Sequence, residues 1–101
     1  MHHIAIDDYV LDVLLPDLAG HDRSPTAFLV YIVLWTKLYR SGDRSTAISL
    51  QQFVESTGMS KTAIQRSILL LKRRRLIAVT RSSPTAVPYY ALIRHWVKRR
   101  R

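Results

Sequence analysis

The sequence of 101 residues contains no cysteine, which excludes disulfide bonds and thiolate metal sites. Its three glycines do not form the phosphate-binding loop of a nucleotide-binding motif. The longest apolar run, Ala27 to Trp35, is shorter than the roughly 20 residues that a membrane-spanning helix requires. The N-terminus also lacks the basic segment, apolar core and cleavage site of a secretory signal. We therefore expect a cytoplasmic protein with no membrane partner.

No acidic residue follows Glu55, so the last 46 residues of the chain contain none. All seven Asp and Glu but only four of the 16 Lys and Arg lie in residues 1–60. The formal charge is therefore −3 in residues 1–60 and +12 in residues 61–101. A field of one sign on one part of a small protein is expected for a polyanion partner.

The composition favours one folded domain with a basic tail. Hydrophobic residues make up 48% of the chain, which is enough for a core, and the length fits a single domain. We assign residues 1–97 to this domain. The last four residues, Lys98–Arg101, are expected to form a basic extension that adds non-specific affinity for a polyanion.

Two helices are predicted before residue 42. Asp7 or Asp8 is suited to cap a short helix over Tyr9–Leu15, and Pro16 and Gly20 argue against its continuation.

The second helix has a strong start signal, because Ser24 is a favoured N-cap residue and Pro25 fits the first helical turn. It is predicted over Ala27–Tyr39 and should end before Gly42. It is apolar on nearly every side, so we expect it either at the centre of the core or at a dimer interface.

A short strand is predicted over Ser45–Ser49, followed by two closely spaced helices. The Ser49-x-x-Gln52 spacing indicates a capping box that opens a helix over Leu50–Thr57. Gly58 suits the left-handed position after that helix. Ser60 then caps a helix from Lys61 to about Arg74.

A β-hairpin is predicted at the end of the domain. Two β-rich runs, Leu76–Arg81 and Val87–Ile93, flank the turn residues Ser82–Thr85. Their spacing indicates a hairpin with a turn of four to six residues.

The order of these elements and the stretch SLQQFVESTGMSKTAIQRSILLLKRRRLI closely resemble winged helix-turn-helix DNA-binding domains of MarR-like and GntR-like regulators. The upstream stretch LLPDLAGHDRSPTAFLVYIVL also resembles the winged domains of plasmid and phage replication initiators. The likeness covers roughly residues 10–93. It implies a mainly α fold with a small β-hairpin, a bacterial or phage origin, and nucleoid-associated DNA binding. One departure is the run Lys72–Arg75, where the family often has a glycine at the helix exit.

The helix that begins at Lys61 has two distinct faces. At ~100° per residue, Ile64, Ile68 and Leu71 form an inner stripe. The opposite face is polar and has no acid, whereas a plain solvated face normally mixes both signs. We predict that it enters a DNA major groove. The candidate DNA-contacting side chains, with one from the hairpin, are Ser60, Lys61, Thr62, Gln65, Arg66, Lys72, Arg73 and Arg81.

Each candidate is suited to a particular contact. Arg66 matches guanine acceptors and Gln65 matches adenine. Ser60 and the free N–H groups beside it suit a phosphate. Lys72 and its neighbour either hold phosphates or favour the helix C-terminus through its dipole. Arg81 flanks the hairpin turn, where it either touches the DNA backbone or belongs to an ordinary surface loop.

These patterns predict a sequence-specific binder of double-stranded DNA, acting as a small dimeric transcriptional regulator. We expect no catalysis, cofactor, metal or small-molecule substrate, because no nucleophile–base pair or ligand set appears. Leu69 on the outward face of this helix and Leu70 on its other flank add to the expectation of a homodimer. Three alternatives stay open: the DNA-binding module of a plasmid or phage replication initiator, a winged-helix protein-interaction module, and an RNA-binding protein.

Overall fold

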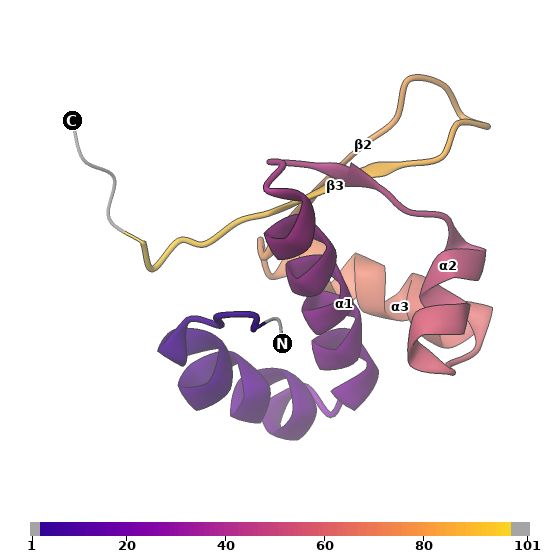
Figure 1. Cartoon of the computed structure of the whole chain (residues 1–101). Helices are drawn as coiled ribbons and strands as arrows, with labels where there is room; N and C mark the ends of the chain where they lie inside the picture. Colours follow the sequence, from indigo (N-terminus) through magenta and orange to yellow (C-terminus); the bar gives the residue numbers. More distant parts are fainter. Residues whose placement is uncertain (1–2, 98–101) are drawn as a thin grey trace.

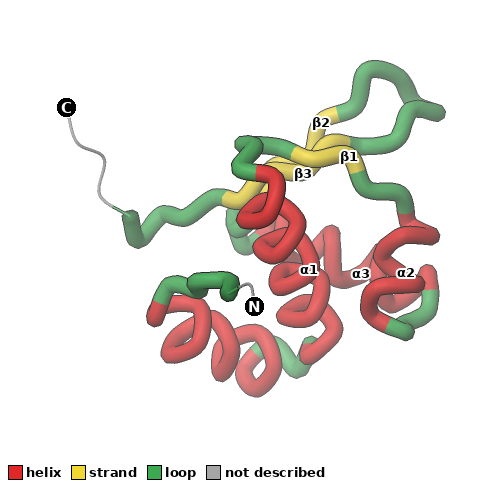
Figure 2. The backbone as a smooth tube through the Cα atoms, viewed as in Figure 1, coloured by secondary structure: helices red, strands yellow, loops and turns green. Residues whose placement is uncertain are grey.

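The computed structural model describes residues 3–97, which form a mainly helical fold with a small three-stranded antiparallel sheet. The predicted class, mainly α with a small β-hairpin, is confirmed at this level. Figures 1 and 2 show the helices gathered below the sheet, with the hairpin loop projecting away from the N-terminal segment. No helix in residues 3–97 is long and apolar enough to cross a membrane.

The N-terminal helix is longer than predicted. It is helical from Asp8 to His21 and includes two π-helical segments, η1 (Val10–Leu14) and η2 (Pro16–His21). The prediction that Pro16 ends the helix was wrong. Pro16 stands at the first position of η2, and Val10, Leu14 and Leu18 are all buried at a spacing of four residues. Burial of this shared apolar face outweighs the local stop signal.

Helix α1 (Pro25–Ser41) begins and ends at the predicted signals. The Ser24 Oγ accepts a hydrogen bond from the Ala27 amide, and Gly42 takes the left-handed conformation with a φ of 73°. Helix α1 lies at the centre of the fold, where it contacts η2, α2, α3 and β3. Its side chains Val30, Tyr31 and Leu34 are completely buried. The apolar character of α1 is therefore explained largely by its central place in the core of the domain.

The next three elements also follow their predicted signals. Strand β1 (Thr46–Ala47) precedes α2 (Leu50–Thr57), and the Ser49–Gln52 capping box is present in full. Gly58 ends α2 with a φ of 73°. Helix α3 (Lys61–Arg73) then begins at Ser60, whose Oγ accepts from the Ala63 amide at 3.2 Å.

Arg75 replaces the missing glycine at the end of α3. It adopts the left-handed conformation with a φ of 54°. The Arg75 amide donates to the Lys72 carbonyl at 3.0 Å, and the Leu76 amide donates to the Leu71 carbonyl at 2.9 Å. These two bonds make a Schellman motif, and the burial of both leucines supplies its usual hydrophobic contact. The exit turn therefore forms without glycine, at the cost of an unfavourable arginine backbone conformation.

The sheet has the strand order β1-β3-β2, with β2 at Ile77–Thr80 and β3 at Tyr89–Leu92. Both strand pairs are antiparallel; Val79 lies opposite Tyr90, which in turn lies opposite Thr46. The loop between β2 and β3 covers residues 81–88 and is longer than the predicted four to six residues. The hairpin therefore ends in a long projecting loop (Figure 1), and Thr85 and Val87 of this loop line a hollow together with side chains of α3.

Aromatic contacts connect the two ends of the described chain. The Tyr9 and Trp96 rings stack with centroids 4.5 Å apart, so Trp96 packs on the domain. The Asp7 carboxylate accepts from Trp96 Nε1 at 2.9 Å and from Arg94 Nη1 at 3.2 Å. The prediction that Asp7 or Asp8 caps the first helix was wrong, because within residues 3–97 the donors to the Asp7 carboxylate are the Arg94 and Trp96 side chains and no backbone N–H donates to either carboxylate. Asp7 instead joins the N-terminal segment to the segment after β3.

Replacing Arg75 with glycine should stabilise the protein. Arg75→Gly removes the left-handed penalty of an L-residue, and we expect the free energy of unfolding to rise by about 0.5–1 kcal/mol in urea titrations. Arg73→Gly is the matched control, because it removes the same charge from a right-handed helical position. It should destabilise the protein by up to about 1 kcal/mol. A destabilising Arg75→Gly change would contradict the assigned turn geometry.

Candidate nucleic-acid interface

The outward face of α3 presents the predicted polar side chains to solvent. The helix is anchored by its opposite face, where Ile64, Ser67 and Leu71 are buried. The Ser67 Oγ donates to the Ala63 carbonyl at 2.8 Å, so this buried hydroxyl has a partner. The helix packs against both α1 and α2. The predicted residues on this helix and at its N-cap that are exposed are Ser60, Lys61, Thr62, Gln65, Arg66, Lys72 and Arg73.

The loop between β2 and β3 supplies the eighth predicted residue, Arg81. This side chain is exposed, and its Nη1 donates to the Pro84 carbonyl of the same loop at 3.3 Å. The bond holds the guanidinium near the loop backbone while leaving most of its donors free. Arg81 of the hairpin thus adds a positive charge next to those of α3.

A groove of about 610 Å³ separates α3 from this hairpin. Gln65, Leu69 and Lys72 line it from the helix, and Arg81 and Val87 line it from the hairpin. Three of the predicted site residues are therefore brought together at one concave surface. Sequence reasoning did not find the groove, because its shape depends on how the hairpin folds back against α3.

Tyr90 lies at the bottom of this groove and connects it to the core. Its side chain is buried and meets Phe53 of α2 edge to face, with ring centroids 5.4 Å apart. Burial raises the pKa of the Tyr90 phenol above its ordinary value, and the nearby Arg81 charge partly opposes this shift. The phenol therefore stays neutral at physiological pH, and the charge of the groove comes from Lys72 and Arg81.

Two cations of the basic half are neutralised by acids of the N-terminal half. Arg74 pairs with Asp17 at 2.8 Å and with Asp22 at 3.1 Å. Arg94 pairs with Asp7 at 3.2 Å. Neither arginine was among the predicted site residues.

The cations of the predicted site behave differently from these two. Within residues 3–97 they form no ion pair, although all are exposed. They are Lys61, Arg66, Lys72, Arg73 and Arg81. The acids therefore compensate charge on one side of α3 and leave its outward face positive.

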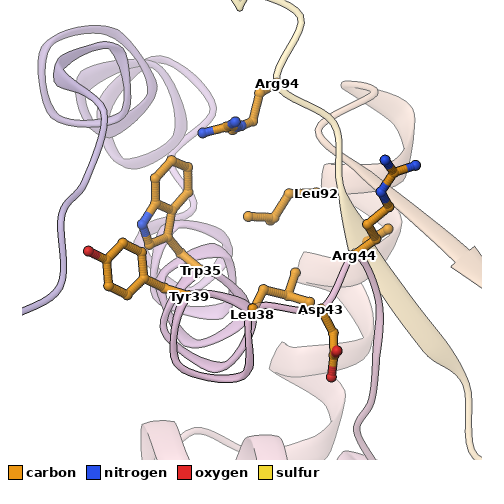
Figure 3. Close-up of a pocket in the computed structure, with 9 residues that line it drawn as sticks. Trp35, Leu38, Tyr39, Asp43, Arg44, Leu92 and Arg94 are labelled. Atoms are coloured by element: carbon orange, nitrogen blue, oxygen red, sulfur yellow. The ribbon is translucent and has the colours of Figure 1, made fainter.

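A second hollow, of about 560 Å³, lies between the end of α1 and β3 (Figure 3). Trp35, Tyr39 and Leu92 line it, and the Arg94 guanidinium lies 5.6 Å from the Trp35 ring centroid. The Trp35 indole donates to the Ala5 carbonyl at 2.8 Å. These contacts hold the terminal segments against α1, so we assign the hollow a structural role.

The remaining predictions and the comparisons with known proteins add no further site residue. The predicted basic tail, Lys98–Arg101, lies outside the described residues. No protein-family model, curated protein or solved structure matches this chain. The site is therefore defined by the charge, exposure and placement of its own residues.

Removing the Arg74 side chain should destabilise the fold, whereas removing its neighbour should not. Asp22 is only 14% exposed, so Arg74→Ala leaves a largely covered carboxylate without its cation. We expect the free energy of unfolding to fall by about 1 kcal/mol, measured by urea titration. Arg73→Ala should change it by less than about 0.5 kcal/mol.

A double-mutant cycle with Asp22→Asn tests the pair itself. The Asn change should have little further effect once Arg74 is gone. Fully additive effects would show that the pair does not couple the two segments.

Proposed function

We propose that this chain is a winged helix-turn-helix protein that binds double-stranded DNA sequence-specifically through α3. Two helices joined at Gly58 and followed by an antiparallel hairpin support this assignment. Helices α2 and α3 would be the two helices of the motif, with α3 as the recognition helix and the β2–β3 loop as the wing.

The observation that carries the proposal is the unpaired positive charge on the outward face of α3 and the adjoining hairpin. A protein surface normally intersperses both signs, but no carboxylate occurs in residues 56–97. Asp17 and Asp22 are paired with Arg74, and Glu55 of α2 accepts a hydrogen bond from Gln51 of its own helix. Phosphates are the partner that such a surface neutralises best.

The mechanism follows from the size of the major groove, which admits one α-helix. The N-terminal turns of α3 would contact base edges in that groove, with Arg66 suited to guanine and Gln65 to adenine. The Ser60 Oγ already accepts the Ala63 amide, so its hydroxyl proton is available for a phosphate. Lys72 and Arg81, on opposite walls of the protein groove between α3 and the hairpin, would contact the DNA backbone.

We further propose that the protein regulates transcription by occupying an operator, without catalysis. Selection of bound sequences from random duplex DNA tests both the binding and the role. A palindromic consensus would support a dimeric regulator. Iterated direct sites would favour a replication initiator. No enrichment of any duplex would contradict the DNA proposal and favour a protein-interaction module.

Arg66→Ala should weaken binding to the selected site and relax its sequence preference. Loss of a bidentate contact to guanine costs about 1–3 kcal/mol at one base-pair position. Titrations of the variant against the selected duplex and its single-base variants would measure the change. Arg40→Ala removes the same charge from an exposed position at the end of α1, and it should leave the preference unchanged. Equal losses for the two variants would contradict the recognition role of Arg66.

We also propose a homodimer, but the side chains that would form its interface differ from those expected from the sequence. The core covers most of α1, so only a few of its apolar side chains are still available for a partner copy. The large apolar side chains exposed on the N-terminal half are Leu11, Val13 and Leu15 of the first helical segment and Leu29 and Tyr39 of α1. We expect a dimer in sedimentation equilibrium at micromolar concentration, and weaker association for Leu11→Ser. A monomer at high micromolar concentration would refute it.

A further inference from the structure

Resting on the proposed DNA binding, we propose that Leu69 selects thymine at one position of the site by contacting its C5-methyl group. Leu69 is 58% exposed on the outward face of α3. Gln65 and Arg66 lie one turn before it and Lys72 and Arg73 one turn after it, at the spacings that place helical side chains next to each other. The leucine is therefore surrounded by the predicted DNA contacts.

The core does not account for this leucine. The buried side of α3 is formed by Ile64, Ser67 and Leu71, and Leu69 points away from them. It lines the groove between α3 and the hairpin, which Val87 also lines from the opposite wall at 48% exposure. An apolar side chain at the centre of a hydrogen-bonding surface indicates a partner with an apolar group at the matching place.

The chemistry of the neighbours favours DNA as that partner. A protein that covered Leu69 would also remove water from the charges of Arg66, Lys72 and Arg73, which is costly without compensating anions. Duplex DNA supplies phosphates for those cations in the same complex. Among the groups that base pairs display in the major groove, the thymine methyl is the apolar one.

Replacing thymine by uracil isolates the methyl group, because the two bases present the same hydrogen-bonding groups. The probe is the duplex recovered by selection, with each thymine replaced singly by deoxyuridine. At one position the wild-type protein should lose affinity about fourfold, the effect of leaving one methyl-sized apolar group uncovered.

Leu69→Ala provides the matched variant, because alanine favours the helix and the side chain is exposed. It should bind the thymine and uracil duplexes with equal affinity at that position. Val87→Ala removes the apolar side chain from the other wall of the groove. It should retain the fourfold preference for thymine, which separates a general loss of apolar surface from the contact at Leu69.

The possible results distinguish this proposal from the one on which it rests. Loss of the methyl effect only in Leu69→Ala supports the assignment. Specific binding with no methyl-sensitive thymine, or with the same sensitivity in Leu69→Ala, overturns the role of Leu69 and leaves the DNA-binding proposal intact. Absence of any selected duplex overturns both.

Discussion

The ion pairs between Arg74 and the N-terminal carboxylates connect the acidic part of the chain to the end of α3. Arg74 follows α3 immediately, and Asp17 and Asp22 belong to the end of the first helical segment. By joining these elements, the pairs fix the acidic part of the chain beside the exit of α3. Because opposite charges attract and the acids are held there, the remaining cations on α3 face solvent without compensation.

A similar contact joins the ends of the described chain. Asp7 receives hydrogen bonds from Arg94 and Trp96, while Tyr9 stacks on the same indole. The segment before η1 is thereby held against the segment after β3, and the Trp35 indole adds a bond to the Ala5 carbonyl. The three carboxylates Asp7, Asp17 and Asp22 therefore connect distant parts of the fold. These contacts account for three of the seven acidic residues of the chain.

The surface that remains has two walls of different origin. Helix α3 is a rigid element, fixed by Ile64 and Leu71 in the core and by the Arg75 turn at its end. The hairpin loop is a more exposed element, supported at its base by Tyr90. A rigid helix is suited to fixed side-chain geometry at base edges, whereas an exposed loop is suited to a DNA backbone of regular shape.

Local signals in the sequence predicted most elements because each depends on neighbouring residues. The Ser24 and Ser60 caps, the Ser49–Gln52 capping box and Gly58 all act within one turn of a helix. The exposed residues of α3 also followed from helical periodicity. By contrast, Pro16 did not stop the first helix, because the helix continues where Leu14 and Leu18 are buried against the rest of the core.

The sequence by itself determined that the second half of the chain is positive and that α3 has one polar face, because charge and helical period are local properties. Only the tertiary structure decided which cations remain free. Arg74 and Arg94 look no different from Arg73 in the sequence, yet their partners lie 57 and 87 residues away along the chain. The groove between α3 and the hairpin likewise depends on chain folding, since Leu69 and Val87 line it from different elements.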